Sequence, residues 1–271
     1  MKYQNFLDVA MTAAQAGGEV LLSMAPQHRL LRLESKAEAD FVTAADRAAE
    51  EKIVSHILAA FPDHQILAEE QTHLGAPEKS AAAAVQWIID PLDGTTNYIH
   101  GVPNFAISIA ARQNDEILVG VVLDPVRAEL FAAVTGEGAT LNGMPIRVSE
   151  STQLRDSLLA TGFPFRIRHH LPAYVRIFQQ FLSAVRDIRR IGSAALDLAY
   201  VAAGRFDGFW EFGLSPWDFA AGSLLVREAH GSFSGFEPEE NFWKTGNILA
   251  SNGTLHQPMR EIILAAKQMT K

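Results

Sequence analysis

The sequence contains no cysteine among its 271 residues, which excludes a disulfide scaffold, a thiolate metal site and a thiol nucleophile. It also lacks a long hydrophobic run. Its most apolar stretches, such as 81–85 and 120–123, fall far short of the about 18 residues that a membrane span needs. Polar residues interrupt any signal-peptide core near the N-terminus. We therefore expect a cytoplasmic protein that makes no membrane contact.

Basic residues are the scarcer charge: 23 Lys and Arg stand against 31 Asp and Glu, a formal net charge of −8. This balance argues against a broad nucleic-acid footprint, which needs a basic face. The hydrophobic share of 48% and the charged share of 20% are typical of globular proteins. A chain of this length can bury about 70–75% of its unfolded surface, so it needs no structural metal simply to fold.

Hydrophobic spacing predicts two helices and then a mainly antiparallel sheet in the first half. Apolar and small residues from Phe6 to Met24 recur at helical spacing, and a second helix is predicted from Thr43 to Ala60. Thr43 and Asp46 have the spacing of a capping box. The predicted strands are Gln65–Glu69, Val85–Asp90, Phe105–Arg112, Ile117–Asp124 and Glu129–Val134.

From about residue 150 the pattern alternates strands with helices, which is typical of an α/β arrangement. The predicted strands are Ser157–Thr161, Asp187–Arg190, Phe206–Glu211 and Asn247–Ala250. The predicted helices are Tyr174–Ala184, Ser193–Ala203, Pro216–Ala229 and Met259–Lys267. We divide the chain into 1–147 and 148–271. Because no flexible linker marks the boundary, we expect the halves to pack tightly as one catalytic unit.

The segment Trp87–Asn97, read WIIDPLDGTTN, carries the most informative chemistry. An apolar strand ends at Asp90, and a turn fixed by proline brings Asp93 three residues later. Two carboxylates on a rigid turn suit a hard cation such as Mg²⁺, and the Gly-Thr-Thr that follows could cradle an anion at a helix start. Such a pair is more often a solvated turn, but Glu69 at another strand end and Asp218 at a helix start strengthen the metal interpretation.

These motifs strongly resemble the inositol monophosphatase family. The family's first hallmark matches 87–96, and its second, Trp-Asp followed by small residues and a glycine, matches 217–222. The likeness covers essentially the whole chain, and segments 160–165 and 190–200 look like the bacterial SuhB type. The resemblance implies a layered αβαβα sandwich, part α+β and part α/β, shared with sugar bisphosphatases. It also implies Mg²⁺-dependent hydrolysis of a phosphate monoester.

The resemblance implies a specific ligand set for two to three Mg²⁺ ions. Glu69, Asp90 and the backbone carbonyl of Leu92 would hold one ion, and Asp90, Asp93 and Asp218 a second. A third, looser ion would lie near Glu69. The four carboxylates would leave the loaded site near neutral, ready for an anionic phosphate.

Catalytic roles follow from the same resemblance. Glu69 and the Thr95 hydroxyl would orient the attacking water, and Asp46 would hold Thr95, although capping its own helix is a competing role. Gly94, Thr95 and Thr96 would cradle the phosphate oxygens.

The resemblance also implies substrate contacts from both halves. Asp93 and Asp218 would face the substrate, Glu211 would bind a hydroxyl, and Ala194 would offer a backbone N–H. Lys36 lies in a polar stretch that resembles the family's mobile loop over the metals, with ordinary surface charge as the alternative.

Within phosphatases, the sequence leaves the substrate open. Inositol 1-phosphate, a small phosphorylated polyol, is the first choice, and Li⁺ inhibition would accompany it. Fructose bisphosphate and a 3′-phosphonucleotide are the alternatives. Arg166 and Arg168 are candidates for a second phosphate, and Trp210 or Phe212 for a nucleotide clamp.

Another class of function stays open as well. Relatives of the SuhB type are associated with transcription antitermination and ribosomal RNA maturation, for which Arg186, Arg189 and Arg190 could form a basic patch. A homodimer is expected, with Arg189–Ala195 as its contact.

Overall fold

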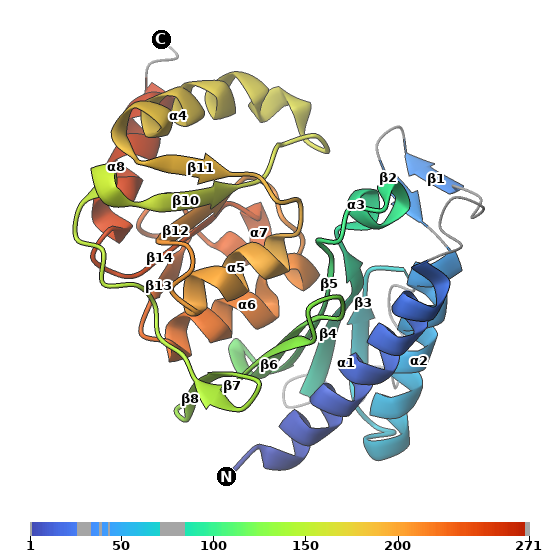
Figure 1. Cartoon of the computed structure of the whole chain (residues 1–271). Coiled ribbons are helices and arrows are strands. Elements are labelled where there is room, and N and C mark those ends of the chain that lie inside the picture. The colour runs from blue at the N-terminus through green and yellow to red at the C-terminus, as the bar shows by residue number, and fades with distance from the viewer. Residues whose placement is uncertain (1, 26–33, 38–39, 43, 71–84, 269–271) are drawn as a thin grey trace.

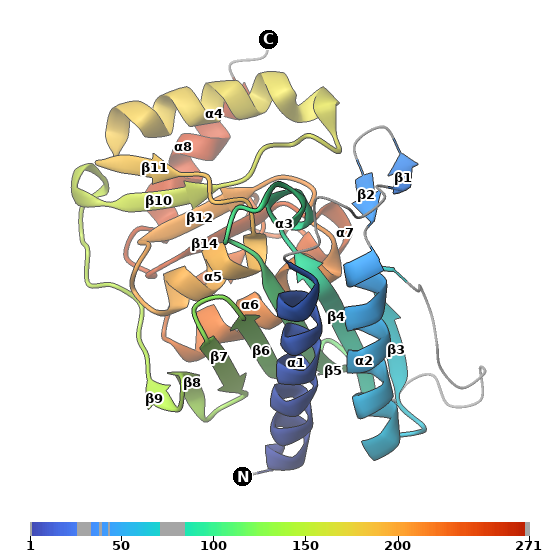
Figure 2. The ribbon, with the colours of Figure 1, turned by 45° about the vertical axis from the view of Figure 1, so that its right-hand side comes forward.

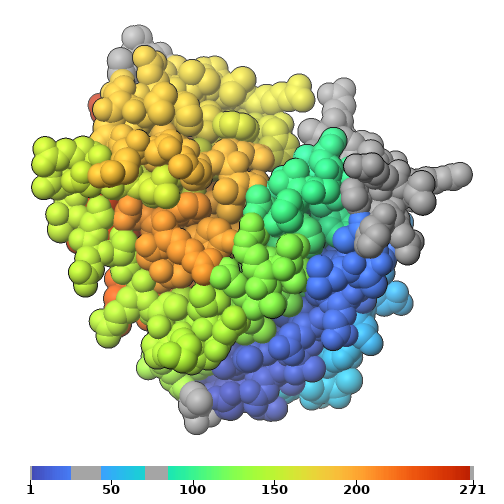
Figure 3. All heavy atoms as spheres, in the orientation of Figure 1, coloured from blue at the N-terminus to red at the C-terminus, as the bar shows by residue number. Residues whose placement is uncertain are grey.

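The computed structural model describes residues 2–25, 34–37, 40–42, 44–70 and 85–268, with only the backbone described for 34–37 and 40–42. Its elements stack in five layers, helices alternating with two sheets (Figures 1 and 2). The predicted αβαβα sandwich is therefore confirmed. In the space-filling view, the green atoms of the first half of the chain lie against the orange atoms of the second half along a continuous boundary (Figure 3).

The larger sheet has seven strands in chain order, antiparallel throughout except for the parallel pair β3 and β4. Helices α1 and α2 cover one face, and α6 packs on the other, so β5 and β6 are buried along almost their whole length. The strands are β3 Gln65–Ala68, β4 Val85–Asp93, β5 Ala106–Gln113, β6 Glu116–Asp124, β7 Glu129–Val134, β8 Gly138–Leu141 and β9 Met144–Pro145.

The smaller sheet has five strands in the order β11-β10-β12-β14-β13. Strand β10 runs parallel to both neighbours, while β14 is antiparallel to β12 and β13. Its outer face is covered by α4 and α8, and α5 and α6 lie between the two sheets (Figure 1). The strands are β10 Leu158–Thr161, β11 Asp187–Arg189, β12 Gly208–Glu211, β13 Ser232–Ser234 and β14 Ile248–Ser251.

The helices agree closely with the sequence pattern. They are α1 Gln4–Met24, α2 Ala44–Ala60, α3 Thr95–His100, α4 Leu171–Ala184, α5 Ala194–Ala202, α6 Pro216–Glu228, α7 Phe242–Thr245 and α8 His256–Gln268, with 3-10 turns at Leu154–Asp156 and Arg168–His170. The pattern predicted neither α7 nor strands β8, β9 and β13. Helix α7 has only four residues, and the three strands, GATL, MP and SFS, contain no run of large apolar residues.

Close packing of α6 on the larger sheet brings the two halves of the chain together. A Cβ at Gly120 on β6 would lie 2.8 Å from the carbonyl oxygen of Ala221 on α6, so only glycine permits this approach. Since Asp218 opens α6 and Asp90 lies on β4 of the same sheet, this packing determines the distance between the two carboxylates.

The predicted roles of Lys36 and Thr43 depend on side chains that the structure does not describe. The polar stretch around Lys36 contains an antiparallel hairpin, β1 Glu34–Ala37 and β2 Asp40–Val42, with Lys36 at an irregularity in its register. Its side chain lies outside the described residues, as does Thr43, the predicted cap of α2. The division at residue 147 stays a prediction. Among the described residues, no helix combines the length and apolar character of a membrane span.

Candidate active site

One cavity collects the ends of elements from both halves of the chain. The ends of β4, β10 and β12 open into it together with the first residues of α3, α5 and α6, as in other sheets whose parallel strands end at a ligand crevice. Ten predicted site residues line it: Glu69, Asp90, Leu92, Asp93, Gly94, Thr95, Thr96, Ala194, Glu211 and Asp218.

Three carboxylates in this cavity form a compact group. Asp90, Asp93 and Asp218 each offer an oxygen, and these oxygens lie within 4.8 Å of one another. Asp90 and Asp218 are 1% and 5% exposed. Strand β4 does not end at Asp90, as predicted, but continues to Asp93. Its register with β5 shifts between Asp90 and Asp93, and this irregularity at Pro91-Leu92 lets both carboxylates reach the same cavity.

The electrostatics of this group favour a bound cation. Burial, followed by repulsion from Asp218, raises the pKa of Asp93 to about 7. Burial and the charge of Glu69 raise the pKa of Asp90 well above its usual range. Three crowded, desolvated carboxylates repel one another, whereas a hard divalent cation prefers such oxygen donors. The residues present therefore fit Mg²⁺.

Glu69 lies on the wall of the same cavity but outside the three-carboxylate group. Burial and the charge of Asp218 raise its pKa to about 8. The guanidinium of Arg166 lies 3.5 Å from Glu69 Oε1 and partly offsets this effect. The turn after Glu69 is held by Glu50, whose buried Oε2 accepts a 2.9 Å hydrogen bond from the Glu70 N–H.

Thr95, the first residue of α3, lies between two acceptors. Its Oγ1 is 3.1 Å from the carbonyl oxygen of Leu92 and 3.5 Å from Oδ1 of Asp46. Asp46 is buried in the first turn of α2, yet its carboxylate reaches α3. The structure thus places Asp46 where it can orient the Thr95 hydroxyl.

Asp93 is held by hydrogen bonds from two residues that the sequence analysis did not identify. Its Oδ2 accepts hydrogen bonds from Ser193 Oγ at 2.6 Å and from the Ala195 N–H at 2.7 Å. Ser193 also caps α5. The Gly-Ser signal for a helix start was visible in the sequence, but nothing local indicates a partner 100 residues away. Asp218 is held similarly, since its Oδ2 accepts the Ser215 N–H at 2.7 Å.

The far wall of the cavity carries Glu211, at the end of β12 and 8% exposed. Burial and the charges of Asp218 and Asp93 raise its pKa to about 8. Gly162 makes room for it, because a Cβ there would overlap the Glu211 carboxylate. Trp210 is fully buried in the core and does not line the cavity, so its suggested part in a nucleotide clamp is wrong.

The model of the inositol monophosphatase family matches residues 2–269. The chain belongs to the inositol monophosphatase family. It is 48% identical over 247 residues to the Nus factor SuhB of Salmonella typhimurium, covering 91% of each chain. The structure superposes on the extragenic suppressor protein SuhB of Bartonella henselae with a TM-score of 0.90, at 39% identity over 96% of this chain and 98% of that one. The structure also superposes on the inositol monophosphatase from Anabaena with a TM-score of 0.86. The two sequences are 41% identical, and the match covers 98% of this chain and 97% of that one.

In this member of the inositol monophosphatase family, the arginines differ from expectation. Both Arg166 and Arg168 are exposed, but only Arg166 lines the cavity. Arg186 and Arg189 pair with nearby acids, Asp156 at 3.3 Å and Asp187 at 2.5 Å, and Arg190 lines the cavity. The three therefore form no uniform basic patch, because neighbouring carboxylates neutralise two of them.

The suggested dimer segment is also corrected in part. Ser193, Ala194 and Ala195 are at most 7% exposed, since the start of α5 packs against the site. Small residues that suited a contact between subunits instead make an intramolecular one.

Proposed function

We propose that the chain hydrolyses phosphate monoesters with Mg²⁺, and that inositol 1-phosphate is its substrate. The observation that carries the proposal is the group of three carboxylates facing the start of α3 in one cavity. Asp90, Asp93 and Asp218 would hold Mg²⁺, with Glu69 and the Leu92 carbonyl as further ligands. Bound Mg²⁺ would supply Lewis-acid chemistry, polarising the phosphoryl group and offsetting the charge of the leaving group.

The chain's own residues would place the two reactants. The first N–H groups of a helix lack intrahelical acceptors, so those of Thr95 and Thr96, after Gly94, can bind phosphoryl oxygens. Thr95 Oγ1, donating to Leu92 or Asp46, keeps its lone pairs for an incoming water. Glu69 Oε1 would accept the proton of that water and align it for attack.

The polyol would lie against the second half of the chain. Glu211 presents a buried carboxylate that can accept a hydrogen bond from a substrate hydroxyl, and Ala194 lines the same cavity. The name of the Anabaena relative, inositol monophosphatase, supports this choice of substrate. Phosphate release from inositol 1-phosphate, with and without Mg²⁺, tests the proposal. Release that is independent of Mg²⁺, or absent, contradicts it.

A sugar bisphosphate is the second candidate, because Arg166 enters the cavity. A distal phosphate would have to draw this guanidinium away from Glu69. If Arg166 binds it, Arg166→Ala should lower kcat/KM for fructose 1,6-bisphosphate at least about tenfold more than kcat/KM for inositol 1-phosphate, which loses only the contact of Arg166 with Glu69. The exposed Arg168→Ala is the matched control, and equal effects of Arg166→Ala on both substrates would exclude this role.

A separate role as a Nus factor is supported by the name of the 48% identical Salmonella relative. Such a role requires a surface that binds other proteins, and it does not require hydrolysis of a substrate. An Asp93→Asn variant used as bait should therefore capture transcription antitermination components from lysate as well as the parent chain does. If Asp93→Asn captures fewer of these components than the parent chain does, the two roles depend on the same metal ligand. If the parent chain captures none, the second role is refuted.

A further inference from the structure

Two turns from distant parts of the chain touch beside Asp93. One is the turn 94–97 that opens α3, and the other is the turn 191–193 that precedes α5; we call their contact the joint. Gly94 and Gly192 both have positive φ, +98° and +90°. A Cβ on Gly94 would lie 3.2 Å from the Gly192 carbonyl oxygen, and one on Gly192 would lie 2.8 Å from Asn97 Nδ2. The absence of a side chain at Gly94 leaves room for the Gly192 backbone, and its absence at Gly192 leaves room for the Asn97 side chain.

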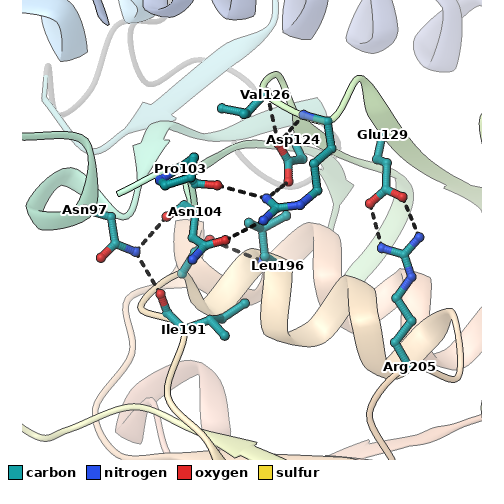
Figure 4. Close-up of polar contacts among 11 residues, drawn as sticks. Asn97, Pro103, Asn104, Asp124, Val126, Glu129, Ile191, Leu196 and Arg205 are labelled. Atoms are coloured by element: carbon teal, nitrogen blue, oxygen red, sulfur yellow. Dashed lines mark hydrogen bonds and ion pairs between the residues drawn. The ribbon is translucent and has the colours of Figure 1, made fainter. Parts of the chain in front are cut away.

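The side chain of Asn97 ties the joint together. Its Nδ2 donates to the carbonyl oxygens of Asn104 at 2.7 Å and Ile191 at 2.8 Å, as Figure 4 shows, and lies 3.4 Å from that of Gly192. Ile191 stands 94 residues further along the chain. One half-buried amide therefore bonds a segment of the first half and a segment of the second half at once.

The first-half side of the joint is itself rigidly held. Arg127 donates to the Pro103 carbonyl and to Asn104 Oδ1, both at 2.9 Å, and pairs with the buried Asp124 at 2.7 Å. Asn97 thus connects the turn 191–193 to a fixed support and not to a loose loop.

The second-half side of the joint leads directly to the proposed metal site. Ser193 follows Gly192, and its Oγ donates to Asp93 Oδ2, as does the N–H of Ala195. A displacement of the turn 191–193 would move both donors and so reorient the Asp93 carboxylate within its group with Asp90 and Asp218.

We propose that Asn97 is a positioning residue: by holding the turn 191–193 against the turn 94–97, it fixes the Asp93 carboxylate in the orientation that binds the cation. The inference rests on the proposed Mg²⁺ site. It assigns Asn97 no contact with substrate.

Direct binding of Mg²⁺ to the full chain, measured by calorimetry without substrate, tests this role. Asn97→Asp puts an acceptor oxygen among carbonyl oxygens, and Asn97→Ala removes the donor. Both should weaken Mg²⁺ binding at least about tenfold. Asn142→Asp is the matched control, because Asn142 also bonds backbone groups, at 2.8 Å and 3.1 Å, in a turn of the larger sheet. It should bind Mg²⁺ as the parent does even if its melting temperature falls equally.

A double-mutant cycle separates positioning from general destabilisation. Because Asn97 is argued to act through Ser193, the losses of Mg²⁺ affinity in Asn97→Ala and Ser193→Ala should be strongly non-additive. Additive losses, unchanged affinity in the Asn97 variants, or equal weakening in Asn142→Asp would overturn the inference. A parent chain that binds no Mg²⁺ would instead overturn the proposed function on which it rests.

Discussion

Replacing Asp93 with asparagine removes one charge and one cation ligand while sparing the fold. The Asp93 Oδ2 acceptor of the Ser193 and Ala195 hydrogen bonds has a counterpart in the amide oxygen of asparagine. The amide nitrogen then faces Asp90 and Asp218 in place of the second carboxylate oxygen. An N–H group cannot bind a cation, so we expect kcat/KM for inositol 1-phosphate to fall at least about 10³-fold, about 4 kcal/mol.

Stability of the metal-free protein should change in the opposite direction. Burial raises the pKa of Asp93 from 3.8 to about 7, which corresponds to at most about 4 kcal/mol, shared with the neighbouring carboxylates. The unfolded chain loses this proton near pH 4 and the folded chain only near pH 7. The contribution of this proton to the free energy of unfolding is therefore fully present below about pH 4 and is lost as pH rises through about 7. Asp93→Asn should be more stable than the parent at pH 8, and the difference should shrink toward pH 5.

Two measurements check this prediction together. Phosphate release reports turnover, and thermal melts with and without Mg²⁺ report stability, since a ligand that binds only the folded state raises its melting temperature. The control is Asp115→Asn, the same chemical change on an exposed hairpin turn. An Asp93→Asn variant with turnover within threefold of the parent, or with an undiminished Mg²⁺-induced rise in melting temperature, would refute the reasoning.

Two further outcomes are expected. Millimolar Li⁺ should inhibit phosphate release, because Li⁺ is close to Mg²⁺ in size but carries half its charge; unchanged rates would show a different ion site. The chain should run as a homodimer in light scattering, at about twice its 29.6 kDa, and a monomer across micromolar concentrations would end that expectation.

Much of the fold could be predicted because its signals are local. Helical spacing located α1 and α2. The dipeptide Asn142-Gly143 is likewise a local signal, typical of a tight turn, and the structure gives both residues positive φ. The motif from Asp90 to Thr96 is also local, since strand, turn and helix start are consecutive in sequence. The family's hallmark could therefore be recognised before the residues were placed in space.

What the sequence could not show depends on contacts between distant segments. Arg166 and Glu69 are 97 residues apart, and Asp93 and Ser193 are 100 residues apart. Each residue has an ordinary local interpretation, Arg166 as a surface charge and Ser193 as a helix cap. The hairpin β1–β2 was missed for another reason: its strands, ESKA and DFV, have only four and three residues and show no alternating pattern.

Specificity for a monophosphate is the last consequence of these long-range contacts. The proposed cation ligands serve one phosphate, and Arg166, which lies 3.5 Å from Glu69, already shares its charge with that carboxylate. A second phosphate in the cavity would meet Glu211 and Asp197, both buried acids, and would compete with them for Arg190, whose charge already acts on both. Leaving such a group unpaired costs several kcal/mol, so kcat/KM for inositol 1-phosphate should exceed that for fructose 1,6-bisphosphate at least about tenfold. Measuring both substrates at one Mg²⁺ concentration decides the question, and equal or reversed values would favour the sugar bisphosphate.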